Sequence, residues 1–314
     1  MENIFEKFFD DCVLLDRRAY KNLVIVPFLH NKEFKHDYIS LDTAIESQEL
    51  IIEEISSDGS VPELNVSNKG DFIVLILDGE ELVGAKQNRV LNTTVLLKNN
   101  TVTRIPVSCV EQGRWGYKSK RFNKSDYIMT SKARMNKRKS VSRNIQSSEG
   151  KNFRSDQGEV WNGVEAFAMK ASIDSPTMAM NDVYEGRKLD IENYLSNIVI
   201  DEKFNGIIAM INGEVVGIEY VSKPDEFKKV LPKLVRSYAA SATLTILKEA
   251  KEDYVEKIRA FLDKLAKTEY KKVPSVSMGE DISIEGTKIS GSALVHDDEI
   301  VHFMAYNEDM VETL

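Results

Sequence analysis

The stretch GIIAMINGEVVGIEYV, residues 206–221, carries the clearest local fold signal in the chain. Two apolar runs flank Asn212-Gly213, and Asn-Gly is the dipeptide preferred in two-residue type I′ turns between antiparallel strands. The stretch therefore predicts a β-hairpin. A closing hairpin is predicted in the same way over residues 291–306, which read GSALVHDDEIVHFMAY.

Short apolar or alternating runs, separated by turn residues, occupy the first third of the chain. Period-two alternation and β-branched residues predict strands there, and a short helix is predicted at Leu41–Gln48. The connections are too short for parallel crossovers, so antiparallel pairing is expected. The predicted strands are Leu23–Leu29, Leu50–Ser56, Pro62–Asn68, Asp71–Leu77, Arg89–Leu97 and Thr101–Cys109.

Helical periodicity dominates the second half. It predicts helices over residues 155–172, 189–198, 224–244 and 254–267, with a kink or break at Pro232. Ser175-Pro176 is typical of a helix start. The predicted fold class is α+β, with an antiparallel β-rich N-terminal portion followed by helices and β-hairpins. Residues 1–314 are expected to form a single domain.

Composition narrows the class of protein. The net charge is -8, two cysteines are present, and the longest apolar run, FIVLIL, has the length of a strand. No membrane association is expected, because a spanning helix needs about 20 apolar residues. The first residues, MENIFEKFFDD, lack the basic start of a secretory signal, and so few cysteines suit a reducing compartment. A cytoplasmic location is therefore expected.

One basic segment stands out in this acidic chain. Residues 114–154 hold thirteen Lys or Arg and only two acidic residues. With few apolar positions, residues 116–153 are predicted to be a long basic loop or insertion. Such a loop could close over an anionic small molecule, or dock an acidic protein or nucleic acid. The overall negative charge makes nucleic acid the less favoured partner.

The stretch LDGEELVGAKQNRVLNT, residues 77–93, mixes acidic, basic and amide side chains. It is not a phosphate-binding P-loop, because Ala85 precedes the lysine and glutamine follows it. Carboxylates at a strand end can hold Mg²⁺ or act as a general base, so Asp78 and Glu81 are candidate metal ligands and Glu80 and Glu81 candidate catalytic residues. The alternative is a solvated turn. The candidate ligand-binding residues that follow are Lys86, Gln87, Asn88, Arg89 and Asn92.

Two further motifs supply candidates. In PVSCVEQGRW, Glu111 is a third candidate catalytic carboxylate, while Arg114 and Trp115 are suited to phosphate pairing and base stacking; Trp115 could equally anchor the core. In SDQGEVW, Asp156 and Gln157 stand at a helix start, where they could cap the helix or help to bind an anion.

These motifs occur in the order typical of one protein family. DGEELVGAKQNRVLNTT, PVSCVEQGRW, SDQGEVW, LPKLVRSY and SGSALVHDDEIVHFMAY together resemble the ARPP-1 family, over about residues 23–306. The family is named for its association with ADP-ribosylglycohydrolase and rhodanese-phosphatase proteins. The resemblance implies a setting in NAD and ADP-ribose metabolism and assigns no catalytic residue.

Two functions are compatible with these observations. One is binding, and possible hydrolysis, of an ADP-ribose- or NAD-derived nucleotide, with Mg²⁺ as a candidate cofactor. The alternative is a non-enzymatic interaction module in which the basic loop docks an acidic protein or nucleic acid. The first requires that the acidic and cationic side chains of the two β-segments converge in one pocket.

Overall fold

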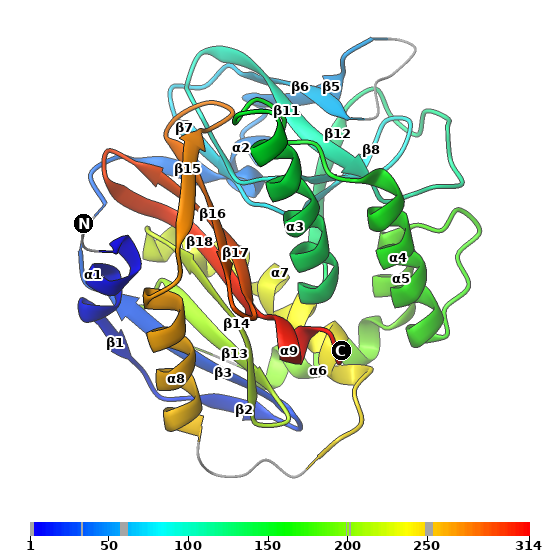
Figure 1. Cartoon of the computed structure of the whole chain (residues 1–314). Coiled ribbons are helices and arrows are strands. Elements are labelled where there is room, and N and C mark those ends of the chain that lie inside the picture. Colours follow the sequence, from blue (N-terminus) through cyan, green and yellow to red (C-terminus); the bar gives the residue numbers. More distant parts are fainter. Residues whose placement is uncertain (1–2, 33, 57–61, 199, 201, 249–253) are drawn as a thin grey trace. The chain divides into compact units, whose positions relative to one another are not determined.

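The computed structural model describes residues 3–32, 34–56, 62–198, 200, 202–248 and 254–314 (Figure 1). The chain divides into two compact units. Unit 1 comprises Met1–Lys35, Leu189–Lys272 and Ile282–Leu314, and unit 2 comprises His36–Lys188 and Val273–Asp281. The assignment of residues 1–314 to a single domain stays a prediction.

A nine-stranded sheet forms the centre of unit 1. Its order is β1-β3-β13-β14-β18-β17-β16-β15, with β2 also paired to β3. The pairs from β1 through β17 are antiparallel. The strands are β1 (Cys12–Leu14), β2 (Arg18–Tyr20), β3 (Leu23–His30), β13 (Gly206–Ile211), β14 (Glu214–Val221), β15 (Tyr270–Pro274), β16 (Glu280–Gly286), β17 (Ile289–His296) and β18 (Glu299–Asn307).

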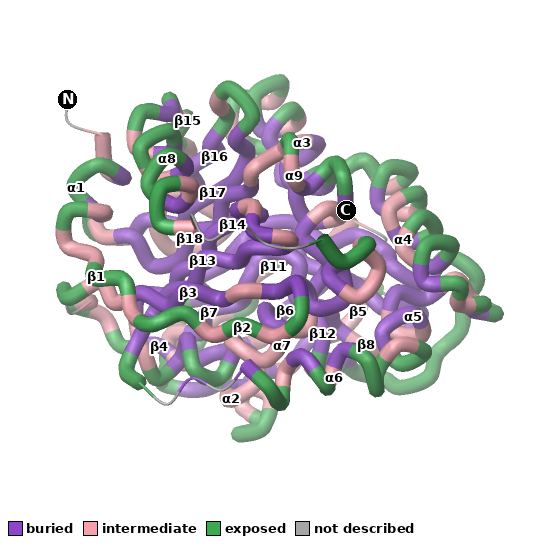
Figure 2. Tube along the Cα trace, turned by 90° about the horizontal axis from the view of Figure 1, so that it is seen from below, coloured by how far each residue is buried: buried purple, intermediate pink, exposed green. Residues whose placement is uncertain are grey.

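Both predicted hairpins are confirmed. β13 and β14 join through Asn212 and Gly213, whose φ angles of 52° and 77° are the positive values that a type I′ turn requires. β17 and β18 join through Asp297 and Asp298, also at positive φ. Every residue of β13 is buried, as its continuous apolar sequence requires, and Figure 2 shows this strand in the buried interior.

Helices pack on both faces of this sheet. One face packs against α1 (Ile4–Asp10) and α8 (Tyr254–Ala266) through an aromatic and aliphatic core that includes Phe8, Phe303 and Phe261. The other face packs against α7 (Pro224–Thr243). The predicted break at Pro232 is absent, since α7 continues past it. The buried residues on either side, Phe227 and Leu234, hold the helix against the sheet.

Unit 2 contains two smaller sheets. A six-stranded sheet has the order β12-β8-β9-β11-β6-β5, and a three-stranded sheet has the order β10-β7-β4. Its elements are β4 (Tyr38–Ser40), α2 (Leu41–Glu46), β5 (Leu50–Glu54), β6 (Glu63–Asn68), β7 (Ile73–Ile76), β8 (Glu80–Gly84), β9 (Arg89–Leu91), β10 (Val95–Leu97), β11 (Thr101–Cys109), β12 (Phe122–Ile128), α3 (Ser131–Ser147), α4 (Gln157–Ala171) and α5 (Met180–Gly186). The remaining helices of the chain are α6 (Lys188–Asn197) and α9 (Glu308–Val311).

Three expectations for unit 2 are corrected. The predicted strand Arg89–Leu97 is two strands in different sheets, β9 beside β11 and β10 beside β7, because the chain turns at Asn92 between them. The pair β4–β7 is parallel, although antiparallel pairing was expected throughout. The helix start expected at Ser175 falls instead at Met180.

The predicted basic loop over residues 116–153 is corrected as well. It contains strand β12 and the 17-residue helix α3. The apolar periodicity that identifies a helix is missing because α3 buries cations, Arg134, Lys137 and Arg138, in addition to Met135 and Val141. The α+β fold class is confirmed. Across the described ranges, no helix combines the length and apolarity that crossing a membrane requires.

Candidate functional site

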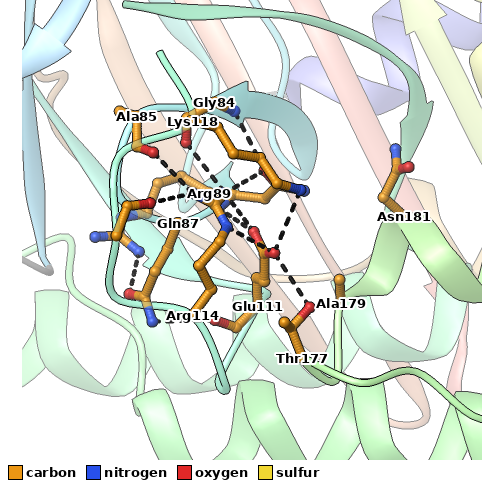
Figure 3. A network of polar contacts seen from close by, with 12 residues as sticks. Gly84, Ala85, Gln87, Arg89, Glu111, Arg114, Lys118, Thr177, Ala179 and Asn181 are labelled. Atoms are coloured by element: carbon orange, nitrogen blue, oxygen red, sulfur yellow. Dashed lines mark hydrogen bonds and ion pairs between the residues drawn. The ribbon is translucent and has the colours of Figure 1, made fainter. Parts of the chain in front are cut away.

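The Glu111–Arg114 ion pair lies directly after β11 in unit 2 (Figure 3). Arg114 donates from Nε to Glu111 Oε1 at 2.8 Å and from Nη2 to Oε2 at 2.6 Å, which is a bidentate pair. The Asn88 backbone N–H and the Thr177 hydroxyl donate to the same carboxylate. Burial alone would raise the pKa of Glu111, but these hydrogen bonds and the charges of Arg114 and Lys118 outweigh it, so the pKa is lowered.

Arg114 also organises the segment between β8 and β9. Its guanidinium donates to the carbonyls of Ala85 at 2.7 Å and Gly116 at 2.8 Å, and more weakly to Gly84. Gly84 and Ala85 both have positive φ, so this turn is conformationally costly without an external hold. Arg114, predicted to bind a ligand, thus has its donors occupied by the protein. Its role in the structure is to position this turn.

Arg89 is fully buried and only partly satisfied. Its Nη1 donates to Gln87 Oε1 at 2.7 Å, and Nη2 lies 3.9 Å from Glu54 Oε1. Within the described residues, Nε and Nη2 of Arg89 and both carboxylate oxygens of Glu54 have no hydrogen-bond partner. Burial lowers the pKa of Arg89. Buried charged groups without hydrogen-bond partners are uncommon, because each costs free energy. Where they occur, a ligand or a water molecule often supplies the missing hydrogen bonds.

A cavity of about 580 Å³ adjoins this pair, with Glu54 in its lining. We call it the unit 2 cavity; it is lined by Glu53, Glu54, Ser56, Tyr117, Lys118, Ser119 and Lys120. Lys86 Nζ lies 5.2 Å from the Tyr117 ring centroid and 5.0 Å from that of Trp115. Each of these aromatic side chains is 52% exposed. An exposed aromatic pair beside lysines is suited to stacking on a planar, anionic ligand.

Sequence reasoning missed Glu54, Tyr117, Lys118 and Lys120. Tyr117, Lys118 and Lys120 could have been identified from the run GRWGYKSK, residues 113–120, in which aromatic and basic residues interleave. This run was assigned to the expected loop. Glu54 had no such signal, because it ends a β-strand of mixed composition.

Glu81 lies in a separate buried environment on β8. Its Oε2 accepts hydrogen bonds from Ser125 Oγ at 2.6 Å and Asn181 Nδ2 at 3.0 Å, and among described residues Oε1 has no partner. Burial raises the pKa of Glu81 to about 7, against the lowering effect of these two hydrogen bonds. The charges of Glu111 and Asp182 raise it further. Its protonation therefore changes near neutral pH.

Asp78 and Glu80 face other partners. Lys137 Nζ lies 2.9 Å from Asp78 Oδ1, and Arg134 Nε lies 3.9 Å from the same atom. Burial lowers the pKa of Lys137 to about 8, although Asp78 opposes the shift. Glu80 accepts a hydrogen bond from the backbone N–H of Leu77 at 2.8 Å. Among the residues described, neither Asp78 nor Glu81, the two candidate metal ligands, belongs to a group of three potential metal-ligating side chains.

The remaining candidates form hydrogen bonds within unit 2. Asp156 caps α4 by accepting from the Glu159 N–H, and Gln157 pairs with both backbone polar groups of Cys109. Asn92 accepts from Ser108 Oγ at 2.6 Å, and Asn88 accepts from Arg114 Nη2. The structure thus brings together Gln87, Asn88, Arg89, Glu111, Arg114, Lys86 and Trp115. Asp78 and Glu80 bond to different groups.

The fold and the site define an α+β protein with a partly unsatisfied, mixed-charge cluster beside a cavity. Residues 11–306 match a family described as the ARG and Rhodanese-Phosphatase-superfamily-associated Protein domain. The chain therefore belongs to the ARPP-1 family, as its motifs suggested. The match spans almost the whole of both units. No curated protein and no solved structure matches the chain.

Proposed function

We propose that the unit 2 cavity binds an anionic nucleotide of the ADP-ribose or NAD class. The observation that carries the proposal is the buried Glu54–Arg89 pair: both Glu54 oxygens are without a hydrogen-bond partner among the described residues, and Glu54 is part of the lining of a cavity of about 580 Å³. A ligand with hydroxyl groups would donate to the Glu54 carboxylate and relieve the cost of its burial. The family description, which associates the domain with ADP-ribosylglycohydrolase proteins, supports the same class of ligand.

The other groups at the cavity fit the parts of such a nucleotide. Tyr117, which lines the cavity, would stack on the base, a contact of roughly 1–3 kcal/mol, while Trp115 lies next to Lys86, as Tyr117 does. Lys118 and Lys120, which line the cavity, would pair with the diphosphate. The ribose hydroxyls would face Glu54. Arg114, fully engaged with Glu111 and the backbone, would hold the turn that carries Lys86.

Hydrolysis is the further part of the proposal. A general acid or base works best when its pKa lies near the working pH; Glu81, with a pKa of about 7, meets that condition, although its carboxyl group is buried on β8 and does not line the cavity. Glu111 is less suited, because its bidentate pairing with Arg114 favours the charged form and its pKa is lowered. Any Mg²⁺ would enter with the nucleotide phosphates, a common mode of binding for this ion.

Calorimetric titration of the full chain with ADP-ribose, NAD and AMP, each with and without Mg²⁺, tests the binding. We expect Tyr117→Ala and Glu54→Gln, both at residues that line the cavity, each to weaken ADP-ribose binding by roughly tenfold or more. Phe72→Ala is the matched control, because Phe72 is an aromatic residue of unit 2 that is 47% exposed and absent from the cavity lining. Heats equal to buffer for all three nucleotides would overturn the proposal. Chromatography of the recovered nucleotide separates turnover from binding alone.

The alternative, docking of an acidic partner on the basic segment, receives less support. Three of its cations, Arg134, Lys137 and Arg138, are buried in α3. Lys137 pairs with Asp78 and Arg138 with Asp281, so these charges are neutralised internally. A partner that binds in a strongly salt-dependent way, and is lost on charge reversal of Lys118 and Lys120 while ADP-ribose gives no heat, would favour the alternative.

A further inference from the structure

A second cavity, of about 410 Å³, lies within unit 1. It is lined by residues of α1, the end of β3, β14 and the β17–β18 turn. None of these residues belongs to the nucleotide site proposed for unit 2. The size is within the range of small-ligand pockets, about 300–1,000 Å³. We call it the unit 1 cavity.

Aromatic rings form one wall of the unit 1 cavity. Phe8 stacks on His30 with 4.4 Å between ring centroids and 12° between ring planes. Tyr220 meets Phe8 edge to face at 4.7 Å, and its hydroxyl lies 3.3 Å from His30 Nδ1. Burial lowers the pKa of His30, so this ring is neutral at pH 7. The wall is therefore uncharged and aromatic, and its rings are packed into the core of unit 1, where Phe8 is 5% and Tyr220 1% exposed.

Charged side chains of both signs line the same cavity. The positive charges are those of Lys7, Lys32 and Lys35, and the negative charges those of Asp297, Asp298 and Glu299. Lys32 pairs with Asp11 at 2.5 Å. Lys35 Nζ lies 3.4 Å from Glu299 Oε1, so these two partly neutralise each other. Across the part of the chain that the structure describes, Lys7 and Asp298 take part in no ion pair. One cation and one anion thus remain available on a cavity with an aromatic wall.

Asp298 lies in the two-residue β17–β18 turn. Asp297 and Asp298 have φ angles of 50° and 62°, in the left-handed region that Gly, Asn and Asp adopt more readily than other residues. The other hairpin of the same sheet places Asn212 and Gly213, the preferred residues, in this conformation. Asp297 Oδ1 lies 4.0 Å from His296 Nδ1, so of the two aspartates Asp298 is the one without an ion pair among the described residues.

We propose that the unit 1 cavity binds a zwitterionic small molecule with an aromatic body, of which an aromatic amino acid is the simplest example. Its ammonium group would pair with Asp298, its carboxylate with Lys7, and its ring would lie against Phe8 and Tyr220. A ligand with only one charge would leave the opposite charge of the cavity uncompensated. This site is independent of the nucleotide function proposed for unit 2.

Calorimetry of the full chain with L-tryptophan tests the proposal, with tryptamine and indole-3-propionate as probes that each lack one charge. We expect tryptophan to bind roughly tenfold or more tightly than either, because each probe leaves one of the two charges, that of Lys7 or that of Asp298, without its partner on the ligand. Lys7→Gln should weaken tryptophan binding by a similar factor. Lys203→Gln, an exposed lysine of unit 1 outside the cavity, should leave it unchanged.

The double substitution Asp297→Asn/Asp298→Gly separates binding from folding. It installs the preferred turn dipeptide, so the melting temperature should hold or rise while tryptophan binding falls at least tenfold. Full binding by this variant would overturn the proposal. No heat with tryptophan, or equal affinity for tryptamine, would overturn it too. Tighter binding of AMP at the same residues would replace the zwitterion with a nucleotide and also end the proposal.

Discussion

Glu81 is a buried carboxyl group whose environment favours the neutral form. Its Oε2 accepts two hydrogen bonds, but among the residues that the structure describes no cation forms an ion pair with Glu81 in the way that Arg114 does with Glu111. The two glutamates therefore have pKa values shifted in opposite directions, raised for Glu81 and lowered for Glu111. Such divergence between neighbouring acids is typical of sites that carry out proton transfer.

The raised pKa of Glu81 makes stability depend on pH. The pKa of Glu81 is about 7 in the folded chain, against the ordinary glutamate value of 4.5 in the unfolded chain, so Glu81 favours folding below pH 4.5 and loses that contribution as the pH rises to 7. We expect the free energy of unfolding of the wild type to fall by roughly 3 kcal/mol relative to Glu81→Gln between these pH values. Urea denaturation from pH 4.5 to 8 measures this difference. Parallel curves for the two proteins would show that the pKa is unshifted.

Arg114 should matter more to stability than an arginine at the surface. Arg114→Met leaves the buried Glu111 carboxylate without its bidentate partner, and we expect a loss of roughly 3–5 kcal/mol. Arg121→Met is the matched control. The Arg121 side chain is 57% exposed, so its ion pair with Glu53 should contribute less than about 1 kcal/mol to the free energy of unfolding. Chemical denaturation of both variants gives the comparison. Equal losses would mean that Arg114 has no special structural role.

Helix α3 shows how a segment can be misjudged from composition. Its sequence, SKARMNKRKSVSRNIQS, has few apolar residues, yet Arg134, Lys137 and Arg138 are buried. Each has an acidic neighbour elsewhere in unit 2: Asp78 for the first two and Asp281 for the third. Buried charges are tolerated only when they are paired and hydrogen-bonded, so the helix depends on partners distant in sequence.

This dependence can be measured on Lys137. Lys137→Met leaves the fully buried Asp78 without its closest cation, and we expect a loss of roughly 3–5 kcal/mol in the free energy of unfolding. Adding Asp78→Asn should recover part of that loss, because the uncompensated charge is removed. Arg143→Met on the same helix, whose partner Glu159 is exposed, is the control. Losses that simply add in the double variant would contradict a direct pairing.

For the molecule as a whole, the two proposed ligands belong to different units. Hydrogen exchange should separate them, because ligand binding slows local opening of the backbone around its site. We expect ADP-ribose to protect amides near residues 54 and 117–120. Tryptophan should protect residues 30–32 and the 297–299 turn. Protection of the same peptides by both ligands would contradict the assignment of two separate sites.

The sequence by itself determined the fold class, both hairpins and several of the strands and helices, since these depend on local periodicity and turn chemistry. It also grouped Lys86, Gln87, Asn88, Arg89, Glu111, Arg114 and Trp115 as related residues. Only the tertiary structure decided which of these side chains has its hydrogen-bonding groups paired within the protein and which lies beside a cavity. The sequence alone does not distinguish the environment of Arg114 from that of Arg89. The donors of Arg114 all meet acceptors in the protein, whereas, among the described residues, Nε and Nη2 of Arg89 do not. The difference depends on residues such as Glu54 and Thr177, which only folding brings near these two clusters.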